Sequence, residues 1–170
     1  PKPGEWRFEV YDPIRELLAE YGLEWAPILN FPPLWSRAAD SRPRRKGGCH
    51  RPEYHDWARF VRGFAAHYRG KIRSVEIWNE PDTPYHWSGG AQAYAAHMER
   101  TAKVIRRYAP QAKISHAGLT GEEKLWRPFS EELMRYGVGS WFDIYSFHYG
   151  QGKSAPLHRR ILEEAGLGSK

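Results

Sequence analysis

The sequence predicts an α/β fold in which four parallel strands alternate with helices. Four short runs rich in β-branched and aromatic residues begin near positions 25, 73, 113 and 142, and this composition is typical of strands. The segments between them carry apolar residues at three-and-four spacing, which is the period of amphipathic helices. Because strands that alternate with helices form βαβ units, we expect all four strands to lie parallel in one sheet.

The composition fits one soluble globular domain. The chain has 170 residues, of which 41% are hydrophobic and 15% aromatic. No apolar run is long enough to span a bilayer, so no membrane partner is expected. Residues 1–5 lack the apolar core of a signal peptide, and without an initiating Met we expect the sequence to start inside a longer protein. The localisation therefore stays open.

The positive charge is concentrated in one segment. The net charge is +6, and residues 36–51 carry six basic side chains against one acidic one, a net +5. A short basic loop of this kind is more often solvated than bound to nucleic acid, so no nucleic-acid partner is predicted. Cys49, the single cysteine, excludes an intrachain disulfide. With His50 and His55 it could supply metal ligands, but without a fourth ligand no metal or cofactor is predicted.

The first helix and strand have clear boundaries in the sequence. After a loop over 4–10, the helix is expected to begin at Asp12 as N-cap, with Pro13 in its first turn, and to end at Gly22. Its apolar stripe is expected to pack on the sheet. The run 25–31 has strand length and composition, although Pro27 removes one ladder donor.

The remaining elements follow the same alternation. Apolar periodicity and Gly or Pro stop signals predict helices, and short apolar runs between them predict strands. The expected elements are a helix over 52–68, a strand over 73–80, a helix over 91–108, a strand over 113–117, a helix over 125–136, a strand over 142–149 and a helix over 157–165.

The stretch 73–82 carries the main candidate for chemistry. Val75, Ile77 and Trp78 favour a strand, and Pro81 stops it directly after Glu80. A carboxylate at the C-terminal end of a strand is where an α/β barrel places catalytic groups. Asn79 offers an amide and Trp78 an apolar face, which are groups that a sugar site needs. The alternative is a surface glutamate beside a turn proline.

The run Trp78-Asn79-Glu80-Pro81-Asp82 resembles the signature at the end of the fourth strand in retaining glycoside hydrolases of the (β/α)8-barrel clan A. It is most similar to family 39, the β-xylosidase and α-L-iduronidase group. The resemblance implies that Glu80 is the general acid/base and that Asn79 hydrogen-bonds the sugar 2-hydroxyl. It aligns the four expected strands with strands three to six. Since a complete barrel needs about 250 residues, the chain is expected to be a partial TIM barrel.

Four further residues are candidates for carbohydrate binding. The resemblance implies that Trp35, after the first strand, lines the sugar cleft. Trp87 lies in a loop beyond a strand end, where it can stack on a pyranose or pack on its own scaffold. The resemblance also implies that the sixth strand supplies a His and a Tyr. His148 and Tyr149 are adjacent, so only one is expected to reach the site without a bulge; a core position is the alternative for His148.

A second carboxylate is missing from the pattern. Retaining hydrolysis needs two carboxylates about 5 to 5.5 Å apart, and the resemblance places the nucleophile on strand seven. Asp143 begins its expected strand, while Glu163 and Glu164 lie on a helix. We therefore expect the acid/base half of a glycosidase site, inactive alone. The alternative is a carbohydrate-binding or catalytically inactive module, and a reading frame continuing past Lys170 into an acidic strand end would favour the enzyme. Open sheet edges predict self-association.

Overall fold

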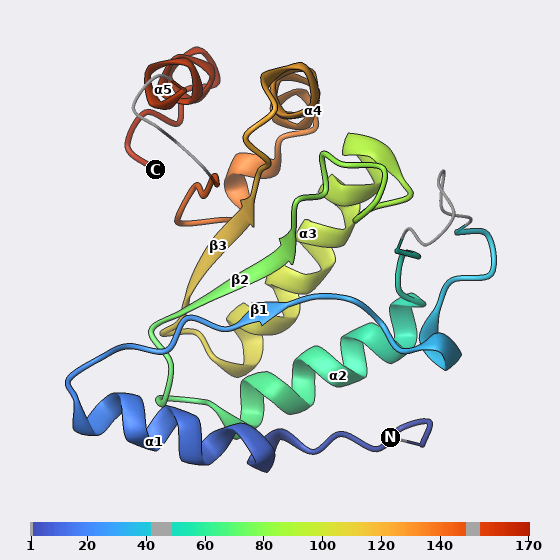
Figure 1. Ribbon diagram of the computed structural model, residues 1–170, viewed down its shortest axis with the longest axis vertical. Coiled ribbons are helices and arrows are strands. Elements are labelled where there is room, and N and C mark those ends of the chain that lie inside the picture. Colours follow the sequence, from blue (N-terminus) through green and yellow to red (C-terminus); the bar gives the residue numbers. More distant parts are fainter. Residues whose placement is uncertain (1, 42–48, 149–153) are drawn as a thin grey trace.

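The computed structural model describes residues 2–41, 49–148 and 154–170. These residues form a parallel sheet of three strands in the order β1-β2-β3, with helices between the strands (Figure 1). The α/β prediction is thereby confirmed. The strands are β1 (Ile28–Leu29), β2 (Ser74–Asn79) and β3 (Lys113–Gly118). The helices are α1 (Asp12–Glu20), α2 (Tyr54–His67), α3 (Gly90–Tyr108), α4 (Glu123–Arg135) and α5 (Ala155–Glu164), with 3-10 turns η1 (Phe8–Tyr11), η2 (Leu34–Ser36) and η3 (Val138–Ser140).

The fourth expected strand runs in the predicted place and direction but is not a regular strand among the described residues. It lies parallel beside β3 and makes two isolated bridges, through Ile144 and Phe147. The N–H groups of Asp143 and Ile144 both donate to the carbonyl of Ile114, at 2.7 and 3.1 Å. Two donors on one acceptor interrupt the even spacing of a parallel ladder, so the prediction of four regular strands is wrong in this respect.

The first strand is also shorter than expected. Only Ile28 and Leu29 form strand, instead of the whole run 25–31. Pro27 has no N–H to donate, and its carbonyl accepts from the Glu76 N–H at 2.9 Å. The partner residues of β1 are Glu76 and Ile77 of β2. β1 is therefore a short edge strand.

The start of α1 differs from the sequence prediction. Asp12 is the first helical residue and Tyr11 is the N-cap, with no side-chain cap hydrogen bond. The Asp12 carboxylate instead lies 3.0 Å from His67 Nε2 in α2. This hydrogen bond lowers the pKa of Asp12 below its usual value. The prediction of an Asp12 cap is wrong because a tertiary partner takes its carboxylate.

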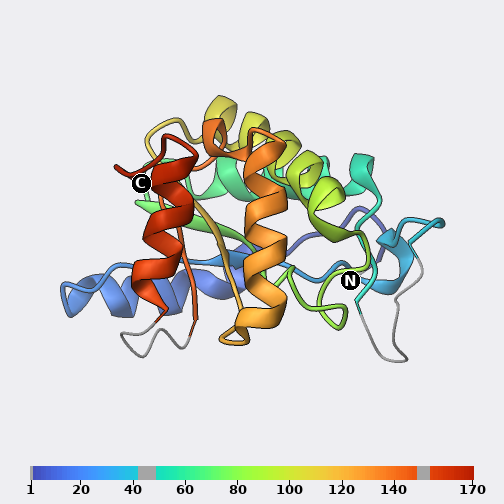
Figure 2. The same ribbon diagram turned by 90° about the horizontal axis from the view of Figure 1, so that it is seen from above.

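Consecutive helices pack against one another beside the sheet, α2 on α3, α3 on α4 and α4 on α5 (Figures 1 and 2). The alternation along β1 follows from this arrangement, since Leu29 is buried in the core while Ile28 is 44% exposed. Parallel partners share a face, so Glu76 and Ser115 lie on the same side of the sheet as Ile28. In a closed (β/α)8 barrel this side is the interior.

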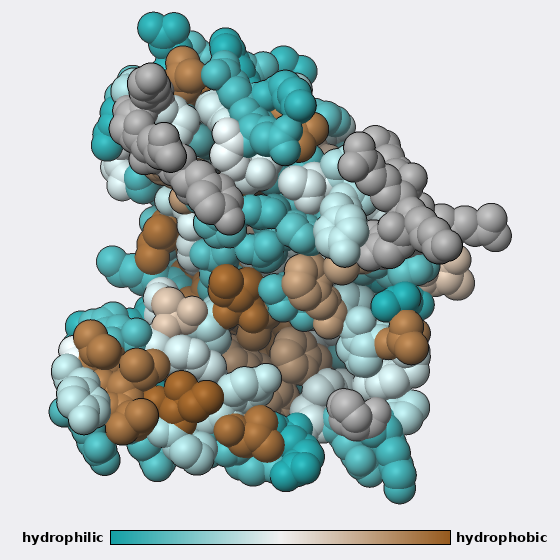
Figure 3. All heavy atoms as spheres, viewed as in Figure 1, coloured by the Kyte–Doolittle hydropathy of each residue, from teal (hydrophilic) through white to brown (hydrophobic). Residues whose placement is uncertain are grey.

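The apolar stripe of α1 is exposed, and the prediction that it packs on the sheet is wrong. Ile14 and Leu17 are 53% and 54% exposed, and Leu23 just beyond the helix is also exposed. Figure 3 shows apolar side chains gathered over α1 at the lower left. Among the described residues, no helix is both long and apolar enough to cross a bilayer.

Candidate functional site

The backbone of β2 is irregular at Trp78, two residues before Glu80, and we call this irregularity the break in β2. Trp78 has a positive φ of 74°, which a bulky residue rarely adopts. The side chain therefore does not alternate to the side of Glu76. It is fully buried and packs against Trp57, Trp87 and His97, at ring distances of 5.8, 5.0 and 5.4 Å. The expectation that Trp78 offers its face to a sugar is thus wrong, since this ring belongs to the core.

The Tyr94 hydroxyl of α3 hydrogen-bonds to both β2 and β3 beside this break. It donates to the Ile77 carbonyl at 2.8 Å and accepts from the Ala117 N–H at 3.1 Å. The side chain is fully buried, and burial raises the pKa of the phenol far above its usual value. One hydroxyl therefore pairs two buried backbone groups, one on each strand.

The next link between the strands leads to Glu80. The Gly118 N–H donates to Glu76 Oε1 at 3.1 Å, and the Gly118 carbonyl accepts from the Glu80 N–H at 3.0 Å. Burial raises the pKa of Glu76. Glu80 itself has a positive φ of 46°, a strained conformation for a residue with a side chain. The backbone of Glu80 is thus fixed to the end of β3.

The Glu80 carboxylate lies between two histidines. His148 Nδ1 is 3.0 Å from Oε1 in a hydrogen bond, and His86 Nδ1 is 3.1 Å from Oε2. The His86 contact has ion-pair distance but not the angles of a hydrogen bond, and we treat it as electrostatic. The Glu80 side chain is only 14% exposed. A carboxylate in such a shielded position interacts more strongly with neighbouring charges than one in open water.

Asp82 holds the loop that follows Glu80. Both of its carboxylate oxygens accept from the Thr120 N–H, at 3.2 and 3.1 Å. Its burial, opposed by these hydrogen bonds and reinforced by the charge of Glu80, raises the pKa of Asp82 to about 6. Sequence reasoning assigned no role to Asp82. Its place two residues after Glu80 gave no sign of the long-range contact with Thr120.

The structure brings together some of the predicted site residues. Asn79 ends β2 opposite Gly118 and is half-buried, and His148 contacts Glu80 directly. Trp35 lies in η2, beyond the C-terminal end of β1. Its ring stands 6.5 Å from that of Trp6, and its buried Nε1 has no acceptor among the described residues. Tyr149 lies outside the residues that the structure describes.

Trp87 is buried in the core, whereas its neighbour His86 contacts Glu80. Trp87 is 3% exposed, and its Nε1 donates to the Gly90 carbonyl at 3.0 Å. The prediction of Trp87 as a sugar-stacking residue is therefore wrong, because the ring fills the core beside Trp78. His86, to which the sequence assigned no role, contacts Glu80. Its proximity to Glu80 in the sequence was the available signal.

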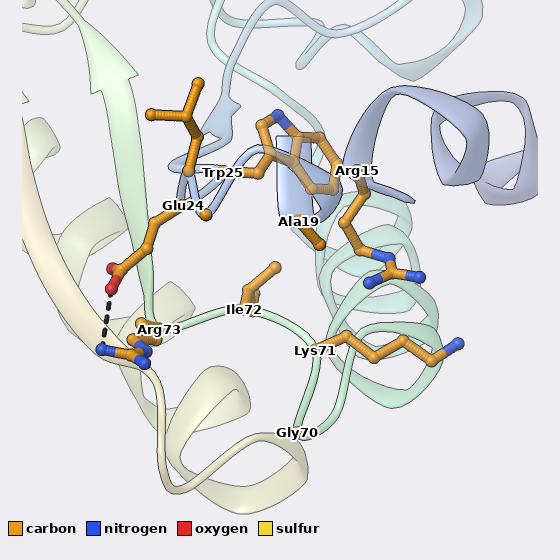
Figure 4. A pocket seen from close by; sticks show the side chains of 10 residues that line it. Arg15, Ala19, Glu24, Trp25, Gly70, Lys71, Ile72 and Arg73 are labelled. Atoms are coloured by element: carbon orange, nitrogen blue, oxygen red, sulfur yellow. Dashed lines mark ion pairs between the residues drawn. The ribbon is translucent and has the colours of Figure 1, made fainter. Parts of the chain in front are cut away.

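A separate pocket of about 300 Å³ lies between α1 and the start of β2 (Figure 4). It is lined by Arg15, Trp25 and Lys71, and an ion pair of 2.7 Å joins Arg73 to Glu24. Because Arg73 precedes β2 and Glu80 follows it, this pocket opens at the opposite edge of the sheet. In barrel enzymes that edge serves stability rather than catalysis. We therefore place the candidate site at Glu80.

One cluster among the described residues has the donor atoms for a metal. Glu53, His55 and Asp56 bring their ligand atoms within 4.8 Å of one another. Glu53 already accepts the Asp56 N–H at 2.9 Å as the cap of α2. Helix capping explains this group, as exposed carboxylates are common at helix starts.

The fold and the position of Glu80 define part of a (β/α)8 barrel, with a carboxylate at the C-terminal end of a strand. A glucosidase from Croceicoccus marinus has a similar structure, with a TM-score of 0.73 and 17% identity, over 100% of this chain and 38% of that one. A GH39 β-xylosidase from Caulobacter crescentus gives 0.72 and 18%, over 93% and 38%.

A third similar structure is xylanase XynB from Paenibacillus barcinonensis, with a TM-score of 0.66 and 14% identity, over 98% of this chain and 55% of that one. The chain thus spans 38% of the first two structures and about half of the third. No protein-family model matches the sequence, and no curated protein matches it significantly. At these identities the likeness establishes the partial TIM-barrel fold that the sequence predicted.

Proposed function

We propose that this chain carries the acid/base half of a retaining glycoside hydrolase site, with Glu80 as the proton donor. The observation that carries the proposal is the Glu80 carboxylate, shielded at the C-terminal end of β2 with a histidine beside each oxygen. The similar structures of a glucosidase, a β-xylosidase and a xylanase support a carbohydrate substrate.

Each residue has a defined part in the proposed reaction. A nucleophilic carboxylate attacks the anomeric carbon, and the glycosidic C–O bond breaks as Glu80 gives its proton to the leaving oxygen. In the second step water attacks the anomeric carbon and gives a proton to Glu80, while the bond to the nucleophilic carboxylate breaks and that carboxylate is released. Asn79 donates to the sugar 2-hydroxyl. Trp35, with its unpartnered buried Nε1, and His148 are proposed to contact the sugar, as the resemblance also implies for Tyr149, which lies outside the described residues.

The nucleophile is expected from outside this chain. The acidic neighbours of Glu80 already serve as backbone acceptors, Glu76 for the Gly118 N–H and Asp82 for the Thr120 N–H. A carboxylate held in this way, with its burial raising its pKa, is poorly placed to attack a sugar. This favours a second candidate function, a carbohydrate-binding module that uses the same residues without turnover.

An external nucleophile separates the two candidates. Sodium azide can attack the anomeric carbon of phenyl β-xyloside or phenyl β-glucoside, while Glu80 protonates the departing phenolate oxygen. We expect no turnover by the chain alone, and azide-dependent formation of the α-glycosyl azide that Glu80→Gln loses. Asn79→Ala should weaken the reaction as well, because the 2-hydroxyl contact strengthens in the transition state.

The outcomes are distinct. Sugar binding with no azide product would favour the binding module over the enzyme. Turnover without azide that disappears in Glu80→Gln would show that a second carboxylate is present, and the assignment of half a site would then be wrong.

A further inference from the structure

Glu80 is fixed from two sides by histidines of different elements. His86 comes from the loop between β2 and α3, and His148 from the segment that follows the bridge at Phe147. Each histidine contacts a different oxygen of the carboxylate, at 3.1 and 3.0 Å. Because His148 hydrogen-bonds one oxygen and His86 lies beside the other, rotation of the carboxylate breaks the hydrogen bond to His148.

The backbone of each histidine is anchored separately. His86 N–H donates to the Thr83 carbonyl at 3.1 Å, and the His86 carbonyl accepts from the buried Trp78 Nε1 at 2.9 Å. His148 N–H donates to the Leu119 carbonyl at 2.8 Å. Both rings therefore project from fixed backbone toward Glu80, which is the requirement for a preorganised group.

The His148 ring lies against the bare α-carbon of Gly118. A Cβ built on Gly118 would come 2.2 Å from His148 Nε2, 2.6 Å from Cδ2 and 3.0 Å from Cε1. Since non-bonded carbon and nitrogen atoms need about 3.5 Å, any side chain here would displace the ring by about 1 Å. The Gly118 φ is not in the left-handed region, so the need for glycine comes from this contact and not from the backbone.

Gly118 therefore affects Glu80 in two ways, through a backbone hydrogen bond and through the His148 ring. Its carbonyl accepts from the Glu80 N–H at 3.0 Å, and its missing side chain leaves the space for the ring that contacts the Glu80 carboxylate. The N–H of Gly118 is held in turn by Glu76. The end of β3 thus fixes both the backbone and the side chain of Glu80.

We propose that Gly118 is a positioning residue, which seats His148 so that His148 and His86 together hold the Glu80 carboxylate in one orientation. The inference rests on the proposed function for its chemical meaning, since a fixed orientation aims the Glu80 proton at the leaving oxygen. It gives His148 a role toward Glu80 itself, beyond contact with a sugar. When Glu80 is ionised, its carboxylate oxygen only accepts, so the hydrogen bond to Oε1 requires a proton on His148 Nδ1.

Gly118→Ala tests this arrangement, and Gly139→Ala is a matched control. A Cβ on Gly139 would come 2.3 Å from Leu167 Cδ1, a similar clash in another part of the molecule. In protein labelled with ¹⁵N at histidine, long-range ¹H–¹⁵N spectra report the tautomer of each ring. We expect the Nδ1–H signature of His148 in the wild type and in Gly139→Ala, and its loss in Gly118→Ala. An unchanged His148 signal in Gly118→Ala would overturn the proposal.

A thermal unfolding cycle covers the case in which Gly118→Ala folds poorly. If the added Cβ acts through the His148 ring, Gly118→Ala should lower the Tm in the wild type but much less in the His148→Ala background. Equal losses of Tm in both backgrounds would show that the added Cβ does not act through the His148 ring, and would contradict the positioning role of Gly118. This cycle needs no enzymatic activity, so it tests the positioning role of Gly118 independently of the proposed function.

The azide reaction adds a functional readout. Gly118→Ala and His86→Leu should each lower its rate about tenfold at saturating glycoside, with KM changed less than twofold, because they disturb the aim of the proton and not sugar binding. Losses that appear only in KM would overturn the positioning role. If the wild type forms no azide product, the proposed function is wrong, and the tautomer spectra still test whether Gly118 positions His148.

Discussion

Removal of the Tyr94 hydroxyl tests how the break in β2 is stabilised. Tyr94→Phe keeps the buried ring and deletes the one oxygen that joins the Ile77 carbonyl to the Ala117 N–H, at 2.8 and 3.1 Å. Each buried backbone group left unpaired costs about 1 to 2 kcal/mol, so the free energy of unfolding should fall by about 3 kcal/mol. This is a large part of the stability of an ordinary domain.

Urea unfolding followed by tryptophan fluorescence measures this change. With a slope of about 2 kcal/mol per molar urea, a loss of about 3 kcal/mol lowers the midpoint by about 1.5 M. The control is Tyr54→Phe, because Tyr54 is exposed and its ring keeps the contact with the Arg100 guanidinium, 4.7 Å away. This variant should change the free energy of unfolding by less than about 0.5 kcal/mol. An equally small change for Tyr94→Phe would refute the account of the break.

Three further predictions concern pH, a core hydrogen bond and association. The pKa of Asp82 rises from 3.8 to about 6 on folding, so the unfolded state loses its proton first and the free energy of unfolding falls as pH rises through this window. Asp82→Asn should not show this fall, so between pH 4 and pH 7 it should gain about 3 kcal/mol of stability relative to the wild type. A difference between the two proteins in urea unfolding that does not change with pH would contradict this prediction. Thr101→Val should cost about 1 to 3 kcal/mol in the same assay, because the buried Trp57 Nε1 donates to Thr101 Oγ1 at 2.9 Å, and a change below about 0.5 kcal/mol would contradict this. The exposed side chains of α1 and the β1 edge should give concentration-dependent self-association in sedimentation velocity, which Leu17→Lys lowers; a monomer at all concentrations would count against it.

The sequence predicted the parallel arrangement and most helices because these depend on local patterns. Apolar spacing and stop signals located α2 and α3 within one or two residues of their observed bounds. The position of Glu80 followed in the same way, since Pro81 ends the strand. The likeness to glycosidase structures then agreed with the barrel that the motif implied.

The errors share a physical cause, which is long-range contact. The sequence suggested Trp78 as an apolar face for a sugar, but this residue has a positive φ and its ring is buried in the core. The Ile77 carbonyl beside that break accepts from the Tyr94 hydroxyl, which lies 17 residues away from Ile77 in the chain. Trp87 is also buried, with its ring 5.0 Å from that of Trp78. The contact of His86 with Glu80 likewise depends on how the loop folds back, which no periodic pattern encodes.

The dependence of the Glu80→Gln effect on the leaving group tests the central claim most directly. A 2,4-dinitrophenolate leaves without a proton, whereas a phenolate needs one from the general acid. In the azide reaction, Glu80→Gln should therefore lower the rate about 10²- to 10⁴-fold with phenyl β-xyloside and by less than about tenfold with 2,4-dinitrophenyl β-xyloside. Equal losses with the two substrates would contradict the assignment of Glu80 as the proton donor.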